Sequence, residues 1–110
     1  MAKRIKIPSG GKKYVLEYTR KTASVMERSG FSLDELTDKP NTMIPMLFRG
    51  AFLANHKDTK ESTIEKIYDG LTRKTALINE LIDMYRATSE TLLDDTPLED
   101  EGNPDWETEE

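Results

Sequence analysis

The 110-residue sequence has no cysteine, one histidine (His56) and one tryptophan (Trp106). The absence of cysteine excludes a disulfide framework, a zinc–thiolate or iron–sulfur site and thiol catalysis. No apolar run approaches the roughly 18 residues that a membrane span needs. The basic start of the chain is not followed by the apolar segment of a secretory signal. We therefore expect a soluble, intracellular protein with no membrane partner.

Hydrophobic residues make up only 35% of the chain, against 34% charged residues, and the formal net charge is -5. This charge is divided unevenly. Residues 1–93 carry all 16 Lys and Arg, whereas residues 94–110 carry nine acids and no base. The acidic block repels itself, and Pro97, Gly102 and Pro104 interrupt any helix within it. We therefore expect one domain over residues 1–93 and a disordered acidic tail over 94–110.

Trp106 lies alone among the acids of this tail, where an indole is unfavourably exposed to water. Two interpretations are open. Trp106 folds back onto the domain, or it docks on a partner. The first 28 residues contain eight Lys and Arg against two Glu, so this basic head is one surface that the tail could cover.

Residues 3–18 predict a β-hairpin: Ile5 and Ile7 alternate with Arg4 and Lys6, residues 8–11 supply turn residues, and the return strand has Val15 and Glu17 on the face opposite its other apolar residues. One face of the hairpin is expected to be apolar: Ile5, Ile7, Tyr14, Leu16 and Tyr18. A lone hairpin is marginally stable in water, so this face must pack on helices or on another subunit.

Helical spacing predicts a helix over residues 19–29 that ends at Gly30. Its inward side chains are expected to be Thr22, Ala23, Val25 and Met26. Ser32 and Glu35 have the spacing of a capping box and predict a short helix after it.

Two more helices are expected nearer the C-terminus, one over residues 60–70 and one capped by Thr72. Their apolar stripes are Ile64, Ile67, Tyr68 and Leu71 in the first, and Leu77, Ile78, Leu81, Ile82 and Tyr85 in the second.

Residues 41–56 predict a helix that is apolar nearly all round. We expect Asn41 or Thr42 to cap it and Pro45 to lie in its first turn. Arg49 is the only charged residue between Met43 and Leu53. Such a helix is normally a buried central one, and Gly50-Ala51 predicts a close approach by another helix.

A domain this small has difficulty covering every side of such a helix. Part of its surface is therefore a candidate docking face, with methionines that adapt to a partner. The candidate partner-binding residues are Met43, Met46, Phe48, Phe52 and Trp106.

No residues suggest catalysis. His56 is expected at a helix C-terminus with no second histidine or clustered carboxylates at ligand spacing, and no Ser or Thr is paired with a base. We expect no enzyme and no catalytic, cofactor-binding or metal site. Nucleic-acid binding by the basic head is an alternative, although no recognition helix is evident.

A resemblance extends over nearly the whole chain. The matching patterns are Tyr18-Thr19-Arg20-Lys21-Thr22, Met26-Glu27, Gly30-Phe31, Lys39-Pro40, Thr42-Met43, Leu47-Phe48, Gly50-Ala51-Phe52-Leu53, Ile67-Tyr68, Leu77-Ile78, Met84-Tyr85 and Gly102-Asn103 with Trp106. In these patterns the sequence resembles small phage and prophage proteins that are similar in genomic role to the tail assembly chaperones of siphophages.

The resemblance implies a non-enzymatic protein in the cytoplasm of the bacterial host, absent from the finished virion. Its partner would be the long helical tape measure protein. In many such phages a frameshifted longer product also recruits the tail tube protein, and homo-oligomers are possible. The expected fold is α+β and mostly α, with an N-terminal hairpin. A small virion connector and a basic-headed nucleic-acid binder, masked by its own acidic tail, are the alternatives.

Overall fold

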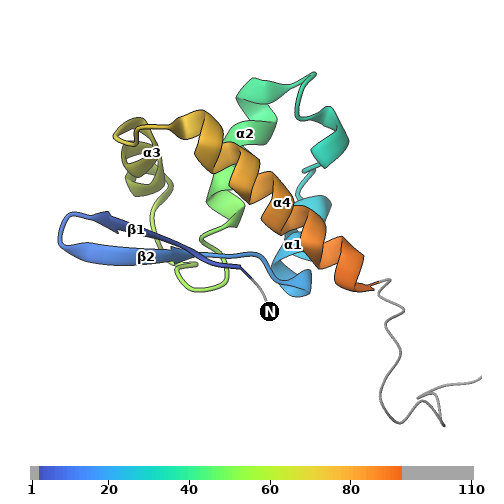
Figure 1. Ribbon diagram of the computed structural model, residues 1–110, viewed down its shortest axis with the longest axis horizontal. Coiled ribbons are helices and arrows are strands. Elements are labelled where there is room, and N and C mark those ends of the chain that lie inside the picture. The colour runs from blue at the N-terminus through green and yellow to red at the C-terminus, as the bar shows by residue number, and fades with distance from the viewer. Residues whose placement is uncertain (1–2, 93–110) are drawn as a thin grey trace, which may run out of the picture.

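The computed structural model describes residues 3–92 of the chain and has an α+β fold that is mostly α (Figure 1). The expected fold class is confirmed. The elements are β1 (Ile5–Ser9), β2 (Lys12–Leu16), α1 (Arg20–Arg28), a 3₁₀ helix η1 (Leu33–Glu35), α2 (Pro40–Gly50), α3 (Glu61–Asp69) and α4 (Lys74–Leu92). The acidic tail expected over 94–110 lies outside the described residues.

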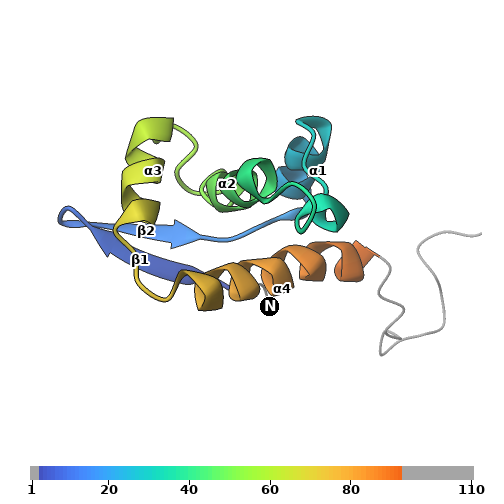
Figure 2. The same ribbon diagram turned by 90° about the horizontal axis from the view of Figure 1, so that it is seen from above.

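The helices enclose one hydrophobic core. Figure 2 shows α1, α2 and α3 along one side of the molecule and α4 along the other, with the hairpin at the edge between them. The largest fully buried side chains are Leu16, Leu47, Phe48, Phe52 and Leu81. They come from the hairpin, α2, the turn after α2 and α4, so the core lies around α2.

The hairpin forms as the sequence predicts. Its register pairs Ile5 with Leu16 and Ile7 with Tyr14, which places the apolar side chains on one face. Gly10 and Gly11 have φ of 58° and 78°, the left-handed values that a tight two-residue hairpin turn needs. Pro8 lies opposite Lys13, at a position that makes no ladder hydrogen bond, so its missing N–H costs nothing.

The chain beyond β2 closes the C-terminal end of α2. The last carbonyls of a helix lack helical partners, and the Tyr18 hydroxyl donates to one of them, the Leu47 carbonyl, at 2.5 Å. The Glu17 N–H donates to the carbonyl of Ala51 at 3.1 Å. The Tyr18 ring also packs edge-on against Tyr85 of α4, at 5.4 Å between centroids. Tyr18 therefore joins the hairpin, α2 and α4.

The segment after α2 covers the outer edge of β2. His56 Nε2 accepts a hydrogen bond from the Val15 N–H at 2.9 Å, and Asn55 Nδ2 donates to the Val15 carbonyl at 3.3 Å. The same Asn55 amide donates to the buried Glu17 carboxylate at 2.7 Å. The prediction that His56 ends a helix is wrong, because α2 ends at Gly50. His56 instead accepts a hydrogen bond from the outer edge of β2.

The helix α1 begins and ends as expected but presents a different face. Thr19 and Thr22 form a reciprocal capping box, and Gly30 follows the C-cap with φ of 106°. Val25, expected inward, is 36% exposed, whereas Met26 is buried. Met26 packs so closely on Gly50 of α2 that a Cβ there would lie 2.3 Å from its sulfur. This contact is the close helix approach that the sequence predicts.

The start of α2 differs from the prediction. It begins at Pro40, where a proline needs no N–H partner, and Lys39 occupies the N-cap position without a side-chain hydrogen bond. Neither Asn41 nor Thr42 is the cap. Pro45 consequently lies inside the helix instead of in its first turn.

The N-caps predicted for two other helices, η1 and α4, are also wrong. The short helix η1 exists, but Ser32 makes no side-chain capping bond, and its N–H lies 3.5 Å from the Met43 sulfur. The last helix, α4, begins at Lys74, after Arg73 with φ of 56°, so Thr72 lies one residue outside the N-cap position.

Substitution Tyr18→Phe is expected to lower the free energy of unfolding by about 1–2 kcal/mol at pH 7, because the Leu47 carbonyl loses its donor. Burial, with a smaller contribution from Tyr85, raises the pKa of Tyr18 well above 10.0. The folded state thus keeps the phenol neutral while the unfolded state ionises. Stability is retained below pH 10 and falls as the pH rises above it.

The measurement is urea unfolding followed by circular dichroism between pH 7 and pH 11. The decline above pH 10 should be shallower in Tyr18→Phe than in the wild type. It should not vanish, since burial also raises the pKa of Tyr85. Equal slopes in the two proteins would contradict the assignment.

Candidate functional site: a groove between α2 and α3

The structure separates the residues that the sequence proposes for partner binding. Met43, Phe48 and Phe52 are 4%, 2% and 1% exposed, so they belong to the core and do not form an exposed docking face. Met46 is only partly buried, and Trp106 lies outside the described residues.

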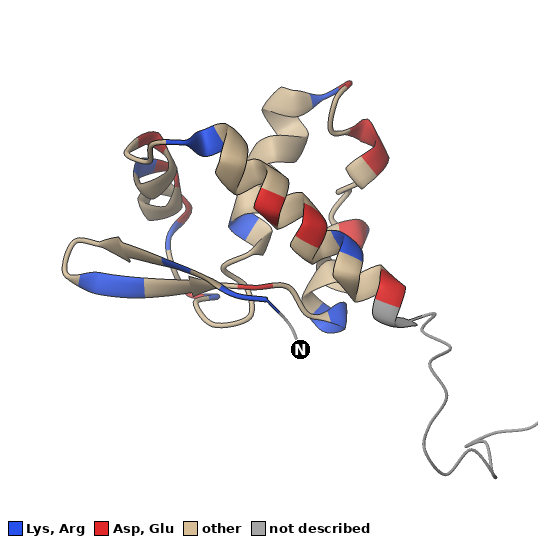
Figure 3. Ribbon diagram, viewed as in Figure 1, with Lys and Arg blue, Asp and Glu red and all other residues tan. Residues whose placement is uncertain are grey.

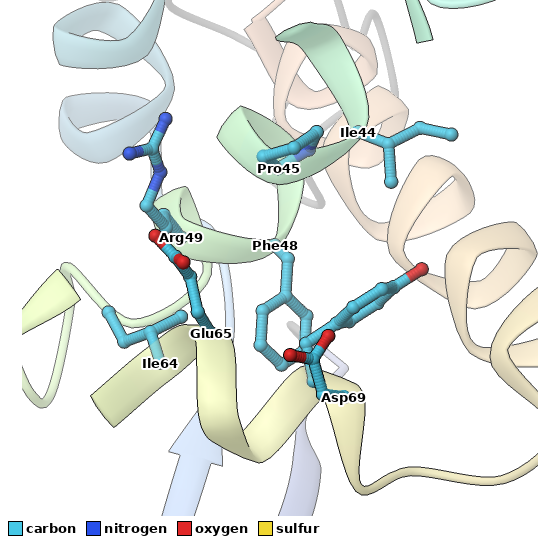
Figure 4. Close-up of a pocket in the computed structure, with 8 residues that line it drawn as sticks. Ile44, Pro45, Phe48, Arg49, Ile64, Glu65 and Asp69 are labelled. Carbon is cyan, nitrogen blue, oxygen red and sulfur yellow. The ribbon is translucent and has the colours of Figure 1, made fainter. Parts of the chain in front are cut away.

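One side of α2 remains open and faces α3 across a groove of about 410 Å³ (Figure 4). The groove is lined by Ile44, Pro45, Phe48 and Arg49 of α2 and by Ile64, Glu65, Tyr68 and Asp69 of α3. Its volume lies in the range typical of ligand sites, and its surface is mostly apolar.

Aromatic rings form the floor. The ring of Phe48 packs edge-on against Tyr68 at 4.9 Å between centroids and against Phe52 at 5.2 Å. Partial burial, and then the Asp69 carboxylate, raise the pKa of Tyr68 above its usual 10.0. The Lys74 ammonium lies 5.6 Å from the centroid of the same ring. The phenol therefore stays neutral at physiological pH, and the floor carries no charge.

The α3 edge of the groove is acidic. Glu61, Glu65 and Asp69 recur every four residues and so lie on one face of the helix. Arg49 pairs with Glu61 at one end. An apolar floor beside a row of carboxylates suits an amphipathic helix whose apolar anchors are flanked by Lys or Arg.

The cations of the hairpin and of the start of α1 follow the lower edge of the molecule in Figure 3. Several of them already have partners: Lys3 pairs with Glu80, Arg4 pairs with Glu17, and the Lys12 ammonium lies 5.2 Å from the Tyr14 ring centroid. Within residues 3–92, Lys6 and Lys13 make no ion pair. Part of the charge of the basic head is thus compensated within the fold.

In the described part of the chain, no group of three or more His, Asp or Glu residues is placed to hold a metal ion. No helix of residues 3–92 is long and apolar enough to cross a membrane.

The sequence pattern did not reveal the groove. Ile44, Pro45, Ile64 and Tyr68 are ordinary apolar positions, and only the packing angle of α3 brings them together. One signal was present, namely the spacing of Glu61, Glu65 and Asp69, which marks a single-sign edge on a short amphipathic helix.

The fold and the groove define a small α+β domain whose candidate site is an apolar groove with an acidic edge. The chain belongs to the family described as "Domain of unknown function (DUF5055)", whose model matches residues 1–109. Comparison with curated proteins and with solved structures found no match.

Pro45→Ala is expected to stabilise the protein. Inside α2, the proline cannot donate to the Asn41 carbonyl, and its ring crowds that carbonyl. Replacement should raise the free energy of unfolding by about 1–2 kcal/mol, after allowing for the greater freedom of the unfolded chain. Urea denaturation at pH 7 measures the change. A lower midpoint would show that the ring's contacts in the groove outweigh the helical hydrogen bond.

Proposed function

We propose that this protein is a phage tail assembly chaperone that holds an amphipathic helix of the tape measure protein in the groove between α2 and α3. The observation that carries the proposal is an open apolar groove with an acidic edge on an otherwise well-packed domain. The resemblance described above supplies the identity of the client. The protein would act in the cytoplasm of the bacterial host before the tail tube assembles.

The size of the groove fits reversible binding. Each large apolar anchor buried in it contributes on the order of 1.5–3 kcal/mol, and the ordering of two chains offsets much of this gain. Two or three anchors therefore give weak single contacts. Many copies along one long client strengthen the whole assembly, yet each copy can still be displaced by tube subunits.

The acidic edge provides the first test. Glu65→Lys and Asp69→Lys, made together, reverse two exposed charges and leave the pair between Arg49 and Glu61 intact. A lysine at position 69 also suits the C-terminal end of α3. Affinity for a basic amphipathic segment of the tape measure protein should fall on the order of tenfold. The control is Asp83→Lys on the exposed face of α4, which should bind like the wild type.

The apolar wall provides the second test. Pro45→Lys places a cation in the groove, and Pro45→Ala makes the same backbone change without a charge. The lysine variant should lose the client in co-purification from cells that express both proteins, while the alanine variant should retain it. Equal retention by both variants, with folding verified by circular dichroism, would refute this binding site.

Mass spectrometry of purified virions tests the role itself. A chaperone is absent from the particle. Its presence at a fixed copy number would contradict the proposal and favour the connector alternative.

A further inference from the structure

A second, smaller groove lies between α1 and α2, on the side of Arg49 away from α3. Its volume is about 190 Å³, and it is lined by Val25, Met26, Ser29, Met46, Arg49, Gly50 and Leu53. Val25, at 36%, is the only exposed large hydrophobic residue in the described part of the chain. Together with the partly exposed Met46 and Leu53 it forms an apolar strip, which we call the α1–α2 strip.

The surroundings of this strip are basic. Lys21 lies four residues before Val25 and Arg28 three residues after it, so both share its face of α1, and both are exposed. Arg49, which is paired with Glu61, lines the groove itself. The two grooves thus have opposite borders, with cations around the α1–α2 strip and carboxylates along α3.

The chain itself contains a segment with the complementary chemistry. Residues 94–110 carry nine acids and no base, and Trp106 lies between Asp105 and Glu107. An indole fits an apolar strip, and flanking carboxylates fit a cationic border. The same segment is repelled by the acidic edge of the α2–α3 groove.

The tail is long enough for Trp106 to reach the α1–α2 strip. Glu27 of α1 and Tyr85, Ser89 and Glu90 of α4 border a common pocket, so the last turns of α4 lie beside α1. Trp106 lies 14 positions after Leu92, and a chain of that length spans at most about 50 Å. A path around one helix, about 10 Å across, lies well within that span.

We propose that Trp106 docks on the α1–α2 strip of its own chain, with the flanking carboxylates against Lys21 and Arg28. The tail then covers the exposed apolar surface of the domain and leaves the α2–α3 groove open. This inference does not depend on the identity of any client.

Trp106 is the only tryptophan, so its fluorescence reports the contact directly. The emission of the full chain should be blue-shifted relative to a synthetic peptide of residues 94–110, and acrylamide should quench it several-fold less. Both effects should persist on dilution and weaken in high salt, because the flanking ion pairs are screened.

Val25→Glu should return both signals to those of the peptide, since it places a repelling carboxylate at the centre of the strip. Pro45→Glu introduces the same charge in the other groove and should leave them unchanged. A double variant, Lys21→Glu with Arg28→Glu, changes only exposed residues of α1 and should also weaken docking of the tail. It tests the proposal if circular dichroism shows that Val25→Glu does not fold.

Three results would overturn the inference: emission and quenching equal to those of the peptide, a folded Val25→Glu protein with wild-type signals, or a blue shift that grows with protein concentration. The last would place the tail on a second copy. No client is present in this experiment, so its failure is separate from any failure of the proposed function.

Discussion

The hydrogen bond from Tyr18 to the Leu47 carbonyl joins the hairpin to α2, and the rest of the fold is built around this connection. It satisfies the open end of the central helix, fixes the hairpin to that helix and brings the Tyr18 ring against α4. Glu17 and Ala51 add a backbone bond beside it. With the end of α2 fixed in this way, the following segment lies along β2, where Asn55 and His56 pair with the strand edge.

The central helix α2 has two structural roles, and its sequence does not show which residues serve which role. One side supplies Met43, Leu47 and Phe48 to the core, while its outer surface forms walls of two grooves, one toward α3 and one toward α1. Arg49 borders both. One groove has an acidic edge and the other a basic border, so the two apolar surfaces on either side of Arg49 differ in the charge that surrounds them.

Local signals account for what the sequence could predict. The glycine turn of the hairpin, the glycine that follows α1 and the apolar stripes of α3 and α4 each depend on neighbouring residues alone. The errors have a different origin. The helix α2 starts at Pro40 rather than after Asn41, and α1 turns Val25 rather than a more polar neighbour outward. In both cases the local sequence allows either arrangement, and tertiary packing favours the one observed. The pairing of His56 with Val15 joins residues 41 positions apart, which no local pattern contains. The α2–α3 groove was missed for the same reason.

Phe48 gives the groove an unusual constraint. The same ring is the floor of the site and one of the least exposed side chains of the core. Truncating such a residue typically costs about 3–5 kcal/mol, a large part of the stability of a small domain. The depth of the groove is therefore inherited from the fold and cannot be tuned. The walls are less constrained: Ile44, Pro45 and the exposed side of α3 can change without loosening the interior.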